Sequence, residues 1–316
     1  MLNYLKENII TVMNYILLTP VRNEEHHLHN FIQSILHQSV LPKIWIILDN
    51  STDKSEQIIQ DAIKDYEWIF YKKQELFSDK GGHGNFSCAM HEAYLYANEI
   101  SHKLDIKYEY IGKTDADVIL PNNFFERLGE QLKLDKKLGV VSGKSYTLKD
   151  VPECPSSPSN SNLIEDWFLP DELPDKRLYR KAFLDSIGGF PITVYSPDSV
   201  ILAKARIRGW GIRWFDDIPI YNMRKDTGIN KDNWGIYTTV GKRIYYLDYH
   251  WALLMLNVLN STVHYPFYSG LAILCGYYHA LKNGTKIDDD EVKNYFKQKR
   301  LHEIQKMVMS TNLRKI

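Results

Sequence analysis

Residues 15–146 alternate short apolar runs with amphipathic segments, and this alternation constrains the fold more than any other feature of the sequence. Runs rich in Ile, Leu, Tyr and Trp predict buried strands at 15–19, 44–48, 68–72, 108–114 and 138–146. Between them, apolar residues at three- and four-residue spacing predict helices at 24–38, 54–66, 86–101 and 122–134. Strands and helices that alternate at this length predict an α/β fold, with a doubly wound, mostly parallel sheet and helices on both faces.

The pattern changes in the second half of the chain. A loop rich in Pro and Ser at 150–162 is followed by a short helix within 177–191 and a helix over about 198–208. The remainder, from 234, is mainly helical. We therefore expect a large domain at 14–230, with halves at 14–146 and 147–230, and a helical C-terminal extension at 231–316.

Composition narrows the class of protein. The 316 residues contain 39 Lys and Arg against 39 Asp and Glu, so no basic field favours nucleic acid as a partner. The three cysteines are far apart and form no CxxC motif, which argues against a structural zinc site or a disulfide framework and fits a reducing compartment. The N-terminus has no small-residue cleavage site after its apolar run. We therefore expect a cytoplasmic protein.

Polar residues follow three of the predicted strands, at the point where each strand ends. Pro20, Arg22 and Asn23 follow the first strand, Asp49 and Asn50 the second, and Asp115 and Asp117 the fourth. Open α/β sheets bind their ligands at the carboxyl ends of the strands. These residues are therefore expected to meet at one rim and to form a binding site.

Asp115 and Asp117 are the sharpest candidates on this rim. Residues two apart in an extended segment point to the same side, where two carboxylates repel each other unless a cation joins them. Mg²⁺ or Mn²⁺ suits carboxylate oxygens and leaves coordination positions for phosphate. The alternative, for an Asp-x-Asp pattern in general, is an exposed acidic turn.

Three further features carry weaker signals. Asp49 suits contact with a base N–H or a sugar hydroxyl, beside residues that also cap the next helix. Asp198 opens a helix and is either its N-cap or a general base.

The glycine-rich stretch around His83 precedes a helix and suits the binding of phosphate, with His83 either a substrate contact or a loop surface residue. The crowded histidines His26, His27 and His29 are interpreted as a solvated helix face.

Five segments, in order, resemble the inverting family-2 glycosyltransferases of the GT-A fold. They are YILLTPVRNEE (15–25), ILDNSTDKS (47–55), YIGKTDADVILPNNFFERL (110–128), YRKAFLDSIGGFP (179–191) and SPDSVILAKARIRGWGIRWF (196–215). The resemblance implies a GT-A-like domain, in which 14–146 binds the nucleotide sugar and 147–230 forms the acceptor side. The chain departs from the family pattern at Arg22, Leu48 and Pro197, where relatives carry Tyr, Asp and Glu.

The resemblance also implies roles for individual residues. Asp49 would contact the base, Asp115 the ribose and diphosphate, and Asp117, with Asp115, a divalent cation (Mn²⁺ or Mg²⁺). Asp198 would be the catalytic base. The rest of the predicted nucleotide-sugar site consists of Pro20, Arg22, Asn23, Glu24, His83 and Lys113.

We therefore predict an inverting glycosyltransferase that moves a sugar from a nucleotide-diphosphate sugar to a hydroxyl of a lipid-linked or cell-surface glycan. The alternatives are a sugar nucleotidyltransferase and a non-catalytic nucleotide-sugar-binding protein on the same fold. The apolar stretch 245–281 has runs too short to span a bilayer. It predicts either peripheral contact with the cytoplasmic face of a membrane, or packing on the core or in a homo-oligomer interface.

Overall fold

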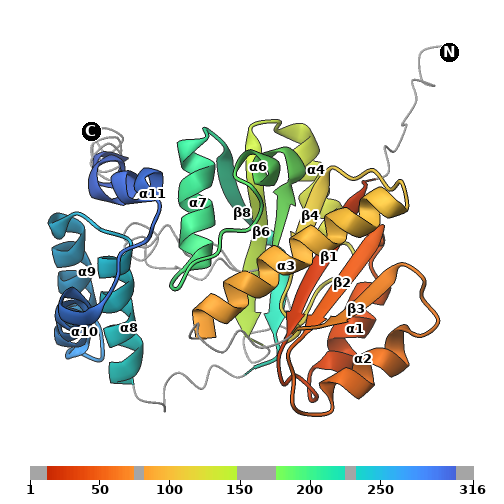
Figure 1. Ribbon diagram of the computed structural model, residues 1–316, viewed down its shortest axis with the longest axis horizontal. Helices are drawn as coiled ribbons and strands as arrows, with labels where there is room; N and C mark the ends of the chain where they lie inside the picture. The colour runs from red at the N-terminus through yellow and green to blue at the C-terminus, as the bar shows by residue number, and fades with distance from the viewer. Residues whose placement is uncertain (1–12, 75–81, 148–175, 225–232, 304–316) are drawn as a thin grey trace.

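The computed structural model describes residues 13–74, 82–147, 176–224 and 233–303 of the chain (Figure 1). Its strands are β1 (Tyr15–Val21), β2 (Ile44–Asp49), β3 (Ile69–Lys73), β4 (Tyr110–Lys113), β5 (Val118–Ile119), β6 (Leu138–Thr147), β7 (Arg177–Arg180) and β8 (Gly211–Asn222). Its helices are α1 (Leu28–Leu36), α2 (Ser55–Ile63), α3 (Gly82–Lys103), α4 (Phe124–Leu134), α6 (Lys181–Ser186), α7 (Pro197–Ile207), α8 (Asn233–Tyr246), α9 (Trp251–Val263), α10 (Ser269–Asn283) and α11 (Asp290–Asn294), which continues into the π-helical turn Tyr295–Lys299.

The eight strands form one sheet in the order β3-β2-β1-β4-β7-β6-β8-β5. Strands β1 to β4 are parallel, and β6 pairs in parallel with β8. Only β7 and the short β5 run antiparallel to their neighbours. The predicted mostly parallel sheet is therefore confirmed, and it has the α/β architecture expected from the sequence pattern.

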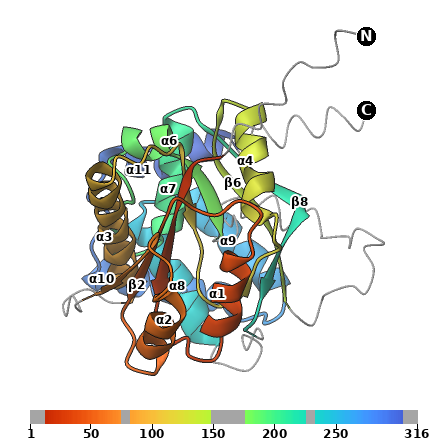
Figure 2. The same ribbon diagram turned by 90° about the vertical axis from the view of Figure 1, so that its right-hand side faces the viewer.

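Helices cover both faces of this sheet, as Figures 1 and 2 show. Alternate side chains of β1 separate the two layers: Tyr15 and Leu17 face helices α1, α2 and α4, whereas Ile16 and Leu18 face α3, α6 and α7. Because both faces are buried, the central strands are almost continuously apolar. This is why short, continuous apolar runs located them in the sequence.

Strand β7 was missed in the sequence, which predicts only a short helix within 177–191. The helix exists as α6, but residues 177–180 form a strand between β4 and β6. The strand has four residues and runs directly into the helix, so no alternation of its own identifies it. It pairs Lys113 of β4 with Arg177, which places two basic residues side by side in the middle of the sheet.

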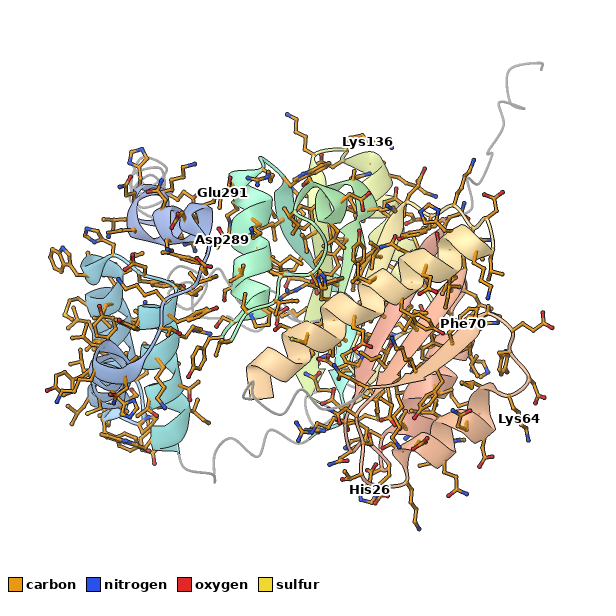
Figure 3. The ribbon with its side chains drawn as sticks, in the orientation of Figure 1. His26, Lys64, Phe70, Lys136, Asp289 and Glu291 are labelled. Carbon is orange, nitrogen blue, oxygen red and sulfur yellow. The ribbon has the colours of Figure 1, made fainter. Side chains whose placement is uncertain are left out.

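The C-terminal helices form a separate layer beside α7. Helix α10 packs between α8 and α9, while α11 and the turn after it contact α7 (Figures 1 and 3). Val200 and Phe296 belong to the apolar part of that contact, and Arg208–Glu291 is an ion pair at its edge (2.8 Å). The predicted helical extension is thus present. Among the described helices, none combines the length and the apolar character that crossing a bilayer requires.

Candidate active site

The loops that follow β1 and β2 are hydrogen-bonded to each other at the carboxyl edge of the sheet. The Asn23 N–H donates to Ser51 Oγ (2.9 Å), and Asn23 Oδ1 accepts from the Thr52 N–H (2.9 Å). Asn23 has a φ of 56°, in the left-handed region that Asn tolerates better than most residues. The Glu24 N–H donates to Ser55 Oγ (2.9 Å). These bonds hold Glu24 at the rim.

Asp49, at the end of β2, is fully buried. Its carboxylate accepts hydrogen bonds from the Ser51 N–H (3.1 Å) and the Tyr71 hydroxyl (3.1 Å). The side chain thus organises the turn after β2 and joins it to β3. Its predicted contact with a nucleotide base stays a prediction.

Glu24, Asp117 and Arg224 form a cluster at the rim. The Arg224 guanidinium contacts Glu24 Oε1, and its Nε lies 3.2 Å from Asp117 Oδ2. Burial raises the pKa of Glu24 to about 7, in spite of the opposing charge of Arg224. Within the described residues, the other two carboxylate oxygens, Glu24 Oε2 and Asp117 Oδ1, are buried without a hydrogen-bond partner. Unpartnered buried carboxylate oxygens are costly, and a cation would remove that cost.

Asp115 has a different partner. The chain turns at Ala116 and Asp117 instead of staying extended, so the two carboxylates contact different cations. Asp115 Oδ2 lies 3.1 Å from Lys176 Nζ. Burial by itself would raise the pKa of Asp115, but the charges of Lys176 and Lys113 outweigh it and hold that pKa below its ordinary value.

Asp198, in the first turn of α7, contacts two buried cations. Its Oδ1 lies 2.8 Å from Arg177 Nη1 and 3.2 Å from Lys113 Nζ, and both basic side chains are at most 2% exposed. Burial opposes ionisation, but Lys113 and Arg177 outweigh it and lower the pKa of Asp198 to about 2. Both contacts use Oδ1, which leaves Oδ2 to accept from another donor. The side chain is 32% exposed, so such a donor can reach it from solvent.

The sequence matches the profile of glycosyl transferase family 2 over residues 16–188. The chain belongs to this family. A search of curated protein sequences found no match.

Solved structures show the same fold. The mannosyltransferase PcManGT from Pyrobaculum calidifontis, solved with GDP-Man and Mn²⁺, has a TM-score of 0.54 at 13% identity, over 86% of this chain and 76% of its own. TarS 1-349 from S. aureus, solved with UDP-GlcNAc, has a TM-score of 0.50 at 14% identity, over 86% of this chain and 73% of its own. At these identities the likeness concerns the fold alone.

Three basic residues of the candidate site in this family-2 protein were not predicted from the sequence: Lys176, Arg177 and Arg224. Lys176 lies just before strand β7 and Arg177 is its first residue. Because this strand was not predicted, their burial next to Asp115 and Asp198 was not predicted either. Arg224 follows β8, whose antiparallel pairing with β5 brings it back to Asp117. The adjacent pair Lys176 and Arg177, ahead of the apolar Leu178 and Tyr179, was the local signal.

The remaining predicted residues are placed as follows. Pro20 lies in β1 opposite Leu48, and Arg22 is exposed at the rim. His83 lies in the first turn of α3, and its side chain is outside the described part of the structure. His26 projects into solvent (Figure 3). In the described ranges, no group of three or more His, Cys, Asp or Glu side chains is arranged to hold a metal ion. Glu24 and Asp117 supply two acids with unpartnered oxygens, one fewer than such a group needs.

Proposed function

We propose that this family-2 protein transfers a sugar, with inversion, from a nucleotide-diphosphate sugar to an acceptor hydroxyl. The observation that carries the proposal is the separation of charge at the rim. Glu24 and Asp117 form an acidic pair with two unpartnered oxygens within the described residues. The buried cations Lys113, Lys176 and Arg177 contact the other two acids, Asp115 and Asp198. A diphosphate with its counter-cation needs both kinds of group.

The acidic pair fits a divalent cation, Mn²⁺ or Mg²⁺. Asp117 would hold it through Oδ1, with Glu24 as an additional oxygen donor, and Asp115 would lie close to the diphosphate. A cation bound there supplies positive charge that stabilises the departing nucleoside diphosphate. With only two carboxylates at hand, the phosphate oxygens and water would complete the coordination.

Asp198 is the proposed catalytic base. It is ionised at neutral pH because the charges of Lys113 and Arg177 lower its pKa to about 2. The same charges make it a weak proton acceptor, so its part is to bind the acceptor hydroxyl through Oδ2 and take its proton late, as the bond to the anomeric carbon forms. One displacement without a covalent intermediate gives inversion.

A panel of nucleotide sugars tests this function. The protein is incubated with UDP-, GDP- and other nucleotide sugars, with and without Mn²⁺, and release of the nucleoside diphosphate is measured with and without mixed glycoside acceptors. We expect one donor to be turned over, and Asp117→Ala to abolish turnover in a folded protein. Pyrophosphate released from a nucleoside triphosphate and a sugar phosphate would favour a nucleotidyltransferase. Donor binding without turnover would favour a binding protein.

We further propose that helices α9 and α10 contact a membrane surface. Residues 251–281 contain no Asp, Glu, Lys or Arg. Exposed apolar side chains form a stripe along each helix: Trp251, Met255, Leu259 and Val263 on α9, and Phe267, Leu271, Tyr278 and Leu281 along or next to α10. With 13 and 15 residues, both helices are too short to span a bilayer. An uncharged face rich in Trp, Tyr and Phe suits the lipid interface.

Co-sedimentation with phosphatidylcholine vesicles, with and without anionic lipid, tests the membrane contact. Trp251→Ser with Phe267→Ser should reduce the bound fraction, whereas Leu134→Ser, an equally apolar exposed residue on α4, should not. If the double variant instead changes the oligomeric state without vesicles, measured by light scattering, the face is an interface between copies of the chain.

A further inference from the structure

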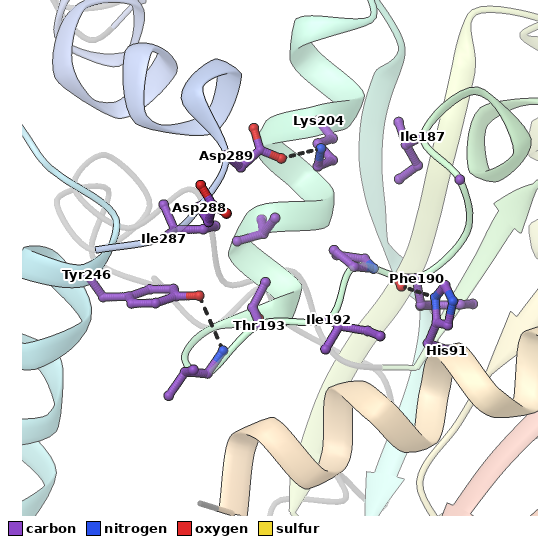
Figure 4. A pocket seen from close by; sticks show the side chains of 14 residues that line it. His91, Ile187, Phe190, Ile192, Thr193, Lys204, Tyr246, Ile287, Asp288 and Asp289 are labelled. Atoms are coloured by element: carbon purple, nitrogen blue, oxygen red, sulfur yellow. Dashed lines mark hydrogen bonds and ion pairs between the residues drawn. The ribbon is translucent and has the colours of Figure 1, made fainter. Parts of the chain in front are cut away.

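A pocket of about 430 Å³ lies between the family-2 domain and the C-terminal extension (Figure 4). The loop between α6 and α7 forms one wall, with Phe190, Ile192 and Thr193. The segment before α11 forms the opposite wall, with Ile287 and Asp288. Its volume is in the range of small-molecule sites, about 300–1,000 Å³. It is separate from the Asp117 cluster, and none of the roles proposed so far uses it.

Thr193 provides the observation that points to a ligand. The residue is 5% exposed, and its backbone is held on both sides, because its N–H donates to Ser87 Oγ (3.1 Å) and its carbonyl accepts from the Ser87 hydroxyl (2.8 Å). Its own hydroxyl is buried without a hydrogen-bond partner within the described structure. A buried hydroxyl without a partner in a pocket wall is a group that a bound molecule would satisfy.

The other lining groups define the chemistry of that molecule. Lys204 Nζ is paired with Asp289 Oδ2 (2.5 Å), so Asp288 leaves the pocket with a net negative charge. This charge disfavours an anionic ligand. Ile192 and Val194 line the pocket while 49% and 43% exposed, and they offer apolar surface to a ring face. Carboxylates and a hydroxyl around apolar walls match a neutral molecule that carries several hydroxyl groups.

We propose that this pocket is an outer subsite for a neutral saccharide unit of the acceptor, an assignment that rests on the proposed glycosyltransferase function. Phe190 and Pro191 line the pocket and also line a narrow cavity that contains Lys113 and Asp198. The pocket is therefore one loop away from the proposed base. A saccharide held there would place the next unit of the same glycan near Asp198, and the C-terminal extension would take part in acceptor recognition.

Ligand-observed NMR with single methyl glycosides tests the subsite directly. The probes are methyl glucoside, galactoside, mannoside and N-acetylglucosaminide, with methyl glucuronide as the anionic comparison. Saturation-transfer signals are titrated for the wild-type protein and for Thr193→Val, Asp288→Asn and the control Asp290→Asn, whose side chain is exposed two residues further along and does not line the pocket. Nucleotide-sugar binding is measured in the same samples.

We expect at least one neutral glycoside to bind and the glucuronide not to bind. Thr193→Val should weaken binding about three- to tenfold, the effect of one hydrogen bond. Asp288→Asn should weaken it similarly and Asp290→Asn should leave it unchanged. Thr193→Val should not lower the melting temperature, because the hydroxyl that it removes has no partner within the described structure. A loss of glycoside binding at an unchanged melting temperature therefore indicates contact with the ligand and not a structural role. If no neutral glycoside binds, or all variants bind as the wild type does, the proposal is wrong.

The two proposals fail separately. Glycoside binding that depends on Thr193, in a protein that binds no nucleotide sugar, would leave the saccharide subsite standing and overturn the transferase function. Turnover of a nucleotide sugar, together with unchanged glycoside binding by Thr193→Val, would support the transferase function and overturn the saccharide subsite.

Discussion

Arg224 lies where a divalent cation is needed, and replacing it should strengthen Mn²⁺ binding. Its guanidinium contacts Glu24 Oε1 and Asp117 Oδ2, so a divalent cation on the other oxygens of these two carboxylates meets its positive charge and must displace it. The side chain is 56% exposed, which puts each contact near the range for solvent-exposed ion pairs, roughly 0.2–1 kcal/mol. Two contacts to partly buried carboxylates therefore cost about 1–2 kcal/mol to break. Arg224→Met should bind Mn²⁺ about five- to thirtyfold more tightly.

The assay is titration of free Mn²⁺ by electron paramagnetic resonance, at fixed ionic strength and without nucleotide. Arg213→Met is the matched control, because Arg213 lies on β8, the strand that Arg224 follows, and its described contact is with the Phe215 ring. A further Asp117→Asn substitution should remove the gain, which separates direct competition from a change in the overall field. Equal or weaker Mn²⁺ binding by Arg224→Met would refute the reasoning.

Further predictions concern folding and pH. Asp198→Asn removes the carboxylate that contacts the buried cations Lys113 and Arg177, and should lower the free energy of unfolding at pH 7 by about 3 kcal/mol, measured by urea denaturation. The exposed Asp61→Asn should change it by less than about 0.5 kcal/mol. Because the folded pKa of Asp198 is below the unfolded value, its stabilisation is complete above about pH 4 and is lost as pH falls toward 2, so the difference between wild type and Asp198→Asn should shrink in acid. The pH profile of kcat/KM should accordingly show no acidic limb from this residue between pH 5 and 8, and a limb that Asp198→Glu moves within that range would contradict the assignment. Gly143→Ala would place a Cβ 2.1 Å from the Ile218 carbonyl oxygen on the neighbouring strand, and should destabilise the fold by at least about 2 kcal/mol, more than Gly211→Ala, which meets a flexible leucine side chain at 3.1 Å.

The fold was predictable where the signal is local. Strands β1 and β2 are apolar on both faces, and α1 carries its buried residues at helical spacing, so each element identifies itself. The rim was predictable from parallel strands alone, and the hydrogen bonds between Asn23 and the loop after β2 confirm that these strand ends meet.

The positions of the basic side chains in the site could not be predicted, because they depend on pairing between distant segments of the chain. Arg177 is buried by the antiparallel insertion of β7, and Lys113 meets Asp198 only when α7 packs against the sheet. The turn at Ala116 and Asp117 is likewise followed by β5, whose pairing with β8 is a long-range contact that the segment itself does not reveal. The Asp-x-Asp pattern therefore located the two acids, but not the basic side chains that pair with each of them.

The basic side chains also explain why the two aspartates of the pattern differ in their expected affinity for a metal ion. Asp115 is neutralised within the protein by Lys176 and Lys113, so it has little charge left to attract a metal ion. In the part of the chain that the structure describes, the ion-pair partner of Asp117 is the exposed Arg224, and that residue can move away without leaving a buried positive charge behind. The cation should therefore bind on the Asp117 and Glu24 side, and Asp115→Asn should weaken Mn²⁺ binding far less than Asp117→Asn does. Equal losses in the same titration would show that both acids hold the cation.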